Sequence, residues 1–257
     1  MTARPGVHLH SLDLVAHLAG REFRLRYRRS LLGWLWAVVL PLARLVVLAF
    51  IFTEVIPLDI EHYTTFLYTG LLAWIWFSAS VSSATTSVVD RSDLLLRPGV
   101  PRWAIPLTAA VGDLIDYVVA LPLLLGWAII DIGVSPTMIA LVPLVVAEFL
   151  LMVGVGYALA PIHVYARDVA RVVEVALLLG FYLTPVFYDP AEMPERLSWV
   201  VEFNPVARVI AAQRTVLIDH TWPSAGTVVG LLLVGVVVLL AGNEVYRRTS
   251  PSLVDEL

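Results

Sequence analysis

Residues 21–50 read REFRLRYRRSLLGWLWAVVLPLARLVVLAF, and this stretch decides the fold class. Five arginines fall within nine residues, from Arg21 to Arg29, and an almost unbroken apolar run follows them directly. A soluble protein would have to bury that run in a core next to charges that need water. At a membrane, the headgroup region accepts the arginines and the hydrocarbon accepts the apolar run. The stretch therefore predicts a membrane protein whose first span begins just after Arg29.

The composition extends this prediction to the whole chain. Of the 257 residues, 59% are hydrophobic and 15% are charged, and the mean hydropathy is +0.84. Soluble domains carry about a quarter charged residues. The formal net charge of −4 provides no overall basic field for nucleic acid, so no nucleic-acid partner is expected. The absence of cysteine excludes disulfides, thiol catalysis and thiolate metal sites.

Six apolar runs have about the 20 residues that a helix needs to cross the hydrocarbon. Residues 1–29 contain no apolar segment of the signal-peptide type, so we expect the first run to stay in the bilayer. The sequence thus predicts an all-α polytopic membrane protein with six transmembrane helices in one domain, 1–257. The predicted spans are 34–56, 64–88, 104–131, 136–162, 170–188 and 224–246.

The distribution of arginine predicts the orientation. Thirteen of the 17 basic residues, all arginines, flank one side of the six runs, at the chain ends and in the loops 89–103 and 163–171. Only Arg196, Arg208 and Arg214 fall on the other side, together with nine acidic residues. Because cytoplasmic loops carry the excess of basic residues, we expect both termini in the cytoplasm.

Residues 11–30 are amphipathic rather than uniformly apolar. Leu14, Leu18 and Leu25 recur at helical spacing, and arginines are available for the opposite face. Such a helix lies in the membrane plane with its arginines among the headgroups. We expect an N-terminal interface helix here.

Residues 189–220 match neither a span nor an ordinary loop. Two helix-like pieces meet at Asn204-Pro205, which is a turn signal. The second piece, Val206 to Asp219, is too short to span and is half polar. We expect short outer helices that lie in the outer interface or dip into the membrane and return. An ordinary surface loop is the alternative, although long structureless loops are uncommon.

The chain lacks the common sequence motifs of catalysis. It contains no GxxxxGK[ST] phosphate loop, no HExxH, no GxSxG and no paired histidines at metal-ligand spacing. Its six histidines are scattered and fall mostly at expected water interfaces. We therefore expect no catalytic residue, no metal and no cofactor bound by this chain.

Four ionisable residues fall at membrane depth: Arg44, Asp113, Asp116 and Glu148. Such residues are costly in hydrocarbon and require partners or a wet cavity. One interpretation is a clamp in which Arg44 pairs with a carboxylate of another helix. The other is a site for an anionic or polar substrate. The sequence favours the clamp, because several acids are available to neutralise one arginine.

Four stretches carry a resemblance to a known family. They read RYRRSLLGWLWAVVLPL (27–42), FLYTGLLAWIWFSASVSSATTSVVDRSDLLLRPGVPRWAIPL (66–107), VYARDVARVVEVALLLGFYLTPVFYDPAEMP (164–194) and FNPVARVIAAQR (203–214). In order and spacing they resemble the permease subunits of ABC exporters of polysaccharide, which include O-antigen, capsule and teichoic-acid transporters. This group lies within the type-2 ABC exporter superfamily, and the resemblance covers nearly the whole chain.

The resemblance implies the partners and the location. Two copies of the permease would form a homodimer in the bacterial plasma (inner) membrane, among its lipids, with two ATP-binding subunits beneath them. A polyprenyl-pyrophosphate-linked glycan would pass outward through the channel of the pair. ATP and Mg²⁺ would be bound by the partner subunits, so this chain would hydrolyse no ATP by itself.

The resemblance also assigns segments by position. Residues 11–30 would be the interface helix, 90–102 and 164–171 the cytoplasmic coupling segments, and 189–220 the outer gate helices. The charged residues expected near the ATP-binding subunits are Asp90, Arg91, Arg97, Arg102, Arg167 and Asp168.

The basic cluster of the interface helix has two candidate roles. Anchoring at the headgroups accounts for most of the charge, and guanidinium groups also suit the oxygens of a pyrophosphate. The residues expected to attract the substrate headgroup are Arg21, Arg24, Arg26, Arg28 and Arg29.

Aromatic residues on the first and fifth spans are the expected channel wall in such transporters. Their rings offer apolar platforms for the C–H faces of sugars, and about half of them should face the lumen. Another group of aromatics on the first two spans is instead expected at the interface or facing lipid: Trp34, Trp36, Trp74, Trp76 and Phe77. The expected channel aromatics are Phe50, Phe181, Tyr182, Phe187 and Tyr188.

Three alternatives remain at this point. The first is a type-2 ABC exporter of a small lipid or drug. The second is a proton-coupled secondary transporter or flippase that uses Asp113, Asp116 and Glu148 as a relay, although such proteins typically contain inverted repeats, which are not detectable here. The third is a non-transporting scaffold, which leaves the basic interface helix and the outer helices without a role.

Overall fold

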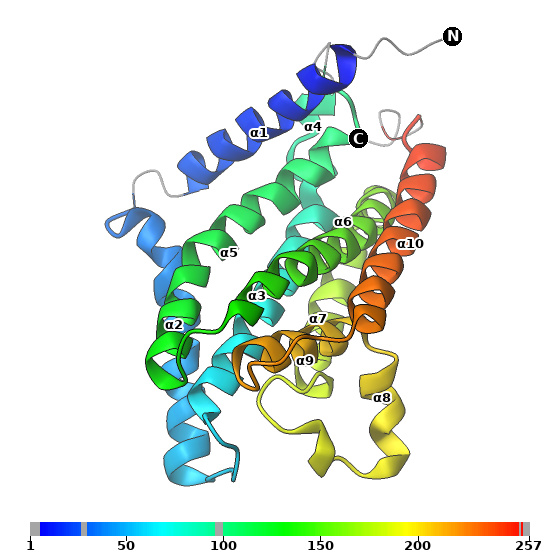
Figure 1. Ribbon diagram of the computed structural model, residues 1–257. Helices are drawn as coiled ribbons and strands as arrows, with labels where there is room; N and C mark the ends of the chain where they lie inside the picture. Colours follow the sequence, from blue (N-terminus) through cyan, green and yellow to red (C-terminus); the bar gives the residue numbers. More distant parts are fainter. Residues whose placement is uncertain (1–5, 27–29, 96–99, 252, 254–257) are drawn as a thin grey trace.

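The computed structural model describes residues 6–26, 30–95, 100–251 and 253. Over this part of the chain the protein is a bundle of α-helices without a β-strand (Figure 1). The predicted all-α class is confirmed.

Five helical segments are long and apolar enough to cross a membrane. They correspond to the first, second, third, fourth and sixth predicted spans. The first is α2 (Trp36–Phe50), which follows a 3-10 turn (Gly33–Leu35) and continues as a π turn (Ile51–Val55). The others are α3 (Tyr63–Asp90), α5 (Ala104–Asp131), α6 (Leu141–Tyr165, after a 3-10 turn at Pro136–Ala140) and α10 (Ala225–Thr249).

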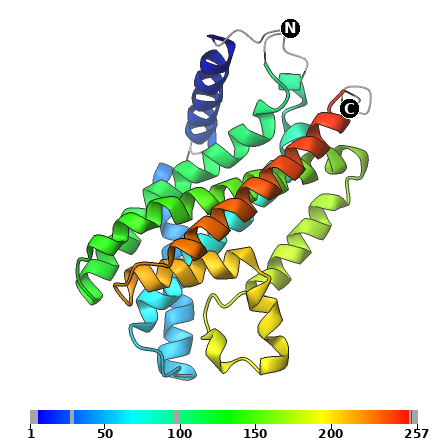
Figure 2. The same cartoon turned by 45° about the vertical axis from the view of Figure 1, so that its right-hand side comes forward.

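The fifth predicted span, 170–188, is a shorter helix than expected. Helix α7 covers Val169–Leu183, which is 15 residues, below the roughly 20 that a crossing needs. The helix ends because Thr184 precedes Pro185, and the residue before a proline is disfavoured in the helical conformation. Thr184 is extended, with φ −86° and ψ 134°. Figure 2 shows α7 running along one side of the bundle from the end where α10 finishes.

Helix α3 is the centre of the bundle. Of its most apolar 18-residue window, 72% is buried, against 17% for the segment that contains α2 and 17% for α10. It packs against α5 on one side and α6 on another. Buried hydroxyls on this helix, such as those of Thr69 and Thr85, donate to the backbone carbonyl four residues earlier, so they need no partner from another helix.

Glycines allow the backbones of helices α6 and α10 to come into contact. A Cβ added at Gly242 would lie 1.9 Å from the backbone oxygen of Gly154, and one added at Gly154 would lie 2.5 Å from the backbone nitrogen of Leu239. The two backbones therefore touch, which is the close approach that small residues permit between membrane helices.

Helix α1 (Gly6–Arg26) confirms that the predicted interface helix is helical, and it packs on α5 at one end of the bundle (Figure 1). Val15 and Ala19 are buried, whereas Arg21 and Arg24 are exposed. The helix begins five residues before the predicted 11–30.

The predicted outer segment consists of short helices. Two 3-10 turns and α8 (Ser198–Glu202) lead to α9 (Pro205–Leu217), whose first turn is capped by the Asn204 side chain. Two pieces joined at Asn204-Pro205 were predicted and are found. Helix α9 is largely buried and packs on α3 and α6, so it dips into the bundle.

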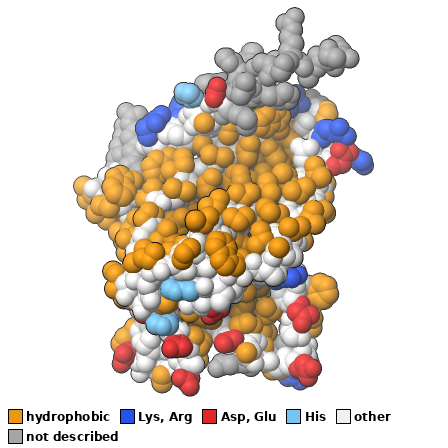
Figure 3. All heavy atoms as spheres, in the orientation of Figure 1, with side chains coloured by type: hydrophobic (Ala, Val, Ile, Leu, Met, Phe, Trp, Pro, Cys, Tyr) orange, Lys and Arg blue, Asp and Glu red, His pale blue; other side chains and the backbone are white. Residues whose placement is uncertain are grey.

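Polar side chains gather at the two ends of the molecule. Helix α1 and the last turn of α10 lie at one end, and the segment that contains α8 lies at the other (Figures 1 and 2). Hydrophobic side chains form a broad band across the middle of the face in Figure 3, and Asp, Glu and His side chains lie below it. This arrangement suits a protein set across a bilayer.

Candidate functional site

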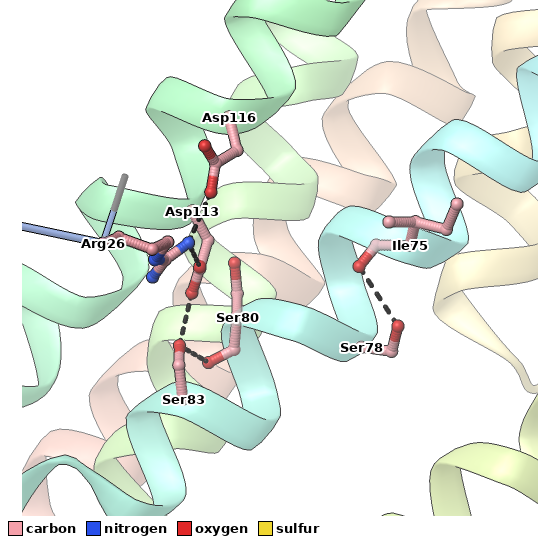
Figure 4. Close-up of polar contacts among 7 residues, drawn as sticks. All are labelled: Arg26, Ile75, Ser78, Ser80, Ser83, Asp113 and Asp116. Carbon is pink, nitrogen blue, oxygen red and sulfur yellow. Dashed lines mark hydrogen bonds and ion pairs between the residues drawn. The ribbon is translucent and has the colours of Figure 1, made fainter. Parts of the chain in front are cut away.

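An arginine and two carboxylates join α1 to the bundle (Figure 4). Nη1 of Arg26, the last residue of α1, lies 2.9 Å from Oδ1 of Asp113 and also binds Oδ2 of Asp116. The two aspartates are three residues apart on α5 and so share one helix face. The Ser83 hydroxyl on α3 donates to Oδ2 of Asp113. We call these four residues the Arg26 clamp.

The Arg26 clamp corrects one expectation. The sequence favoured Arg44 as the cation that neutralises an intramembrane carboxylate, and this pairing was wrong, because α1 lies along α5 and brings Arg26 to Asp113. Arg26 was also predicted to attract a substrate headgroup; its side chain is 38% exposed, and that role stays a prediction. Asp113 is only 4% exposed, so it is the buried carboxylate that most needs a cation.

A cavity of about 450 Å³ adjoins the clamp. Its polar end holds Arg26, Asp113 and Asp116, and its walls come from α2, α3 and α5. Trp76 lines it and stacks on Tyr117, with ring centroids 4.2 Å apart. Trp76 is 2% exposed and Trp74 is 7% exposed. The expectation that these two tryptophans face lipid was therefore wrong, because α3 is the buried helix of the bundle.

A second, larger groove of about 610 Å³ lies between α2, α3 and α7. Helix α2 contributes the exposed side chain of Arg44. Helix α3 contributes Trp74 and Ser78, and α7 contributes Phe181 and Tyr182. We call this the Arg44 groove.

Four of the five expected channel aromatics form one cluster at the C-terminal end of α7. Phe181, Tyr182, Phe187 and Tyr188 are in ring contact, with neighbouring centroids 5.2–6.3 Å apart. Phe52 joins them by stacking on Phe187, at 5.4 Å, and the sequence did not single it out.

Phe50 stands apart from this cluster. It is 59% exposed, and no ring contact to it occurs within the described residues. The π turn at Ile51–Val55 begins one residue after Phe50. Residues two positions apart on a helix point about 200° away from each other, which agrees with the contact of Phe52, and not of Phe50, with Phe187.

Arg214 on α9 is a buried arginine, which the arginine distribution singled out only as one of three on the side opposite the termini. It is 7% exposed and donates to the carbonyl oxygens of Phe66, Pro185 and Val186, with N···O distances of 2.7–3.2 Å. Its guanidinium carbon also lies 3.3 Å from the centroid of the Phe66 ring. Burial lowers the pKa of Arg214 to about 9, and the charge of Asp189 opposes this shift. Arg214 thus stays charged at neutral pH and holds the extended segment after α7.

Glu148 has a different partner from the two aspartates. It is fully buried on α6, and Nε2 of Gln213 on α9 donates to its Oε2 at 3.3 Å. The structure therefore separates the three acids of the proposed proton relay into two groups. Asp113 and Asp116 bind Arg26, whereas Glu148 accepts a hydrogen bond from Gln213 on α9.

The charged residues of the two predicted coupling segments, 90–102 and 164–171, differ in their contacts and exposure. In the first, Arg102 donates to the backbone oxygen of Ser250 at 2.5 Å, and its own carbonyl accepts from Tyr246 at 2.8 Å. Arg102 therefore ties this loop to the end of α10 rather than standing free for a partner. In the second, Arg167 and Asp168 are exposed between α6 and α7.

The remaining predicted residues divide as follows. Asp90 is exposed at the end of α3, and the short helix α4 (Ser92–Leu95) follows it after Arg91, which is partly buried. Arg28, Arg29 and Arg97 lie outside the described residues.

Comparison with known proteins assigns the family. A family model described as ABC-2 type transporter matches residues 13–218. The chain belongs to the ABC-2 type transporter family. An O-antigen export system permease protein RfbA of Myxococcus xanthus is 33% identical over 240 residues, which is 91% of each chain. An RfbA of Klebsiella pneumoniae is 27% identical over 92% of each chain, and a polysialic acid transport protein KpsM of Escherichia coli is 23% identical over 98% of each.

Proposed function

We propose that this ABC-2 family member is the permease subunit of a polysaccharide exporter that moves a lipid-pyrophosphate-linked glycan out of the cytoplasm. The observation that carries the proposal is the full-length similarity to permeases named for O-antigen export, which covers 91% of both chains. The polysialic acid transport relative extends the likeness to a second surface glycan. No relative reported above is named for export of a small lipid or drug.

The exposed apolar faces of α2 and α7 support a pair of copies. Val46 and Val47 on α2 are 65% and 57% exposed, and Leu178 and Leu179 on α7 are 58% and 56% exposed. The same two helices carry the aromatic cluster and line the Arg44 groove. We propose that α2 and α7 of two copies face one another and enclose the channel.

The proposed topology has six crossings with both termini in the cytoplasm. Helix α7 and the extended residues after it together complete the crossing that α7 alone is too short to make. The position of α1 and the end of α10 at one end of the bundle supports an even number of crossings (Figure 1). The excess of arginine at that end supports its assignment to the cytoplasm of a bacterial plasma membrane.

A separate ATP-binding subunit is the proposed source of energy. The exposed turn at 164–171, with Arg167 and Asp168, is the preferred docking point on this chain. ATP and Mg²⁺ belong to that partner. Arg21 and Arg24 are exposed on α1 and are the described arginines best placed to attract a pyrophosphate.

Reconstitution tests the proposal. The chain is placed in nanodiscs alone, with its ATP-binding subunit, and with that subunit plus a polyprenyl-diphosphate-linked oligosaccharide. We expect no ATP hydrolysis by the chain alone, basal hydrolysis by the complex, and stimulation by the lipid-linked oligosaccharide. Stimulation by phospholipid analogues but not by the lipid-linked oligosaccharide would instead assign the small-lipid alternative.

A further inference from the structure

We propose that the Arg44 groove is a binding station inside the membrane for the diphosphate–sugar junction of the lipid-linked glycan. The inference rests on the proposed function, because it names a point along the path of that substrate. It concerns Arg44 on α2, Trp74 and Ser78 on α3, and Tyr182 on α7.

The depth of Arg44 is the first observation. It lies eleven residues beyond Gly33, where the first helical segment begins, roughly 16 Å along the axis at 1.5 Å per residue. A hydrocarbon core is about 30 Å thick, so this charge falls near the middle of the crossing. An arginine at that depth is costly unless it faces a partner or water.

The second observation is that the acids which could neutralise Arg44 are used elsewhere. Asp113 and Asp116 bind Arg26, and Glu148 binds Gln213. Within the residues that the structure describes, Arg44 has no hydrogen bond or ion pair, and its side chain is exposed to the groove. Its partner is therefore water or a group outside the described residues, and the proposal assigns this place to the diphosphate of the substrate.

The third observation is the chemistry of the groove around Arg44. Trp74, Phe181 and Tyr182 form an aromatic wall, with Trp74 and Phe181 centroids 6.3 Å apart. Aromatic faces pack against the apolar C–H faces of sugars. A guanidinium fork matches the oxygens of a phosphate and does so better than an ammonium. A cation next to an aromatic wall suits a ligand that joins phosphate to sugar, and the linkage of a lipid-linked glycan has this composition.

A carboxylate of a second copy is the main competing partner. Helix α2 contains no acidic residue, and α7 contains one, Glu174, six residues into the helix. Glu174 lies about 8 Å along the helix from the start of α7, so it is shallower than Arg44. An ordinary phospholipid phosphate is the other competing partner.

The test uses the complete exporter complex in nanodiscs, with Arg44→Gln and Arg44→Lys compared with wild type. The matched control is Arg208→Gln, which removes an exposed arginine on α9, outside the groove. We expect both Arg44 variants to lower the maximal ATPase rate with a polyprenyl-diphosphate-linked oligosaccharide by about tenfold, the scale of a lost charge-assisted hydrogen bond. Basal hydrolysis, measured in phospholipid alone, should stay at the wild-type rate.

The melting temperature of the solubilised complex separates binding from structure. Because Arg44 has no partner within the described chain, Arg44→Gln should leave the melting temperature unchanged or raise it. A lower melting temperature that Glu174→Gln reproduces would assign an ion pair between copies and overturn the proposal. Equal loss of rate in phospholipid alone would assign an ordinary lipid contact, and a wild-type rate in Arg44→Gln or Arg44→Lys would also overturn it. If the wild-type complex itself shows no stimulation by the lipid-linked oligosaccharide, the result contradicts the proposed function and not the assignment of the Arg44 groove.

Discussion

The α6–α10 seam and the α2–α7 side of the molecule are packed in opposite ways. At the seam two backbones touch, so that a single methyl at Gly242 would lie 1.9 Å from a carbonyl oxygen. On the α2–α7 side, the Arg44 groove of about 610 Å³ lies between helices, and large apolar side chains are exposed. Interiors are normally close-packed, so the difference indicates two tasks. The seam is closed by its own backbone contact, whereas α2 and α7 carry the surfaces that we propose meet a ligand and a second copy.

The largest expected effect comes from filling the seam. Gly242→Leu forces a side chain against the Gly154 backbone, which cannot move without separating the helices. We expect about 3 kcal/mol of destabilisation or more, seen as loss of folded protein or a large fall in melting temperature in detergent. Gly230→Leu is the matched control on the same helix, because a Cβ there meets nothing within 4 Å. Equal effects of the two substitutions would mean that the seam is not closely packed.

The next effect concerns Arg214 on α9. It binds carbonyls of α3 and of the segment after α7, so it links the central helix of the bundle to the segment that carries Phe187. Arg214→Leu keeps much of the volume but leaves buried carbonyl oxygens without donors, at a cost of about 1–3 kcal/mol each. We expect a melting temperature well below that of Arg208→Leu, its exposed counterpart on α9. Similar melting temperatures would show that Arg214 does not hold the segment.

A smaller effect is expected at the Arg26 clamp. Arg26→Ala strands the buried carboxylate of Asp113, and we expect a cost of about 2 kcal/mol. This is less than the 3–5 kcal/mol of a fully buried pair, because Arg26 is 38% exposed and solvent screens part of the loss. Adding Asp113→Asn should recover part of the melting temperature, since the stranded charge is then gone. Arg24→Ala, on the exposed face of α1, is the control. No recovery in the double variant would assign the clamp a different energetic role.

Hydropathy predicted the all-α class and five of the six proposed spans, because crossing length is a property of a single segment. The orientation expected from the arginine counts stays a prediction. The end of α7 was missed, although Thr184-Pro185 signals it. The Arg26 clamp was not readable from the sequence, since the partner of a charge depends on the direction in which α1 crosses α5. Phe52 was missed because hydropathy does not show which side of the first span turns toward α7. The sequence thus placed Arg44 correctly in a span but assigned it the wrong partner.

The substitutions with the smallest expected effect on folding distinguish the α2–α7 side from the α6–α10 seam most directly. Leu179 on α7 and Leu233 on α10 are exposed to nearly the same degree, 56% and 58%. Truncating either to alanine should change the stability of the single chain by less than about 0.5 kcal/mol, because an exposed side chain has few internal contacts to lose. If α7 meets a second copy, Leu179→Ala should weaken pairing, since apolar side chains at the centre of an interface contribute most to association. Leu233→Ala should leave pairing unchanged, because α10 is already packed on α6 and faces lipid with its other side.

Single-molecule photobleaching of labelled copies in nanodiscs at low protein density measures the fraction of pairs. A loss of pairing confined to Leu179→Ala would place the contact between copies on the loosely packed side, and a loss confined to Leu233→Ala would move it to the outside of the seam.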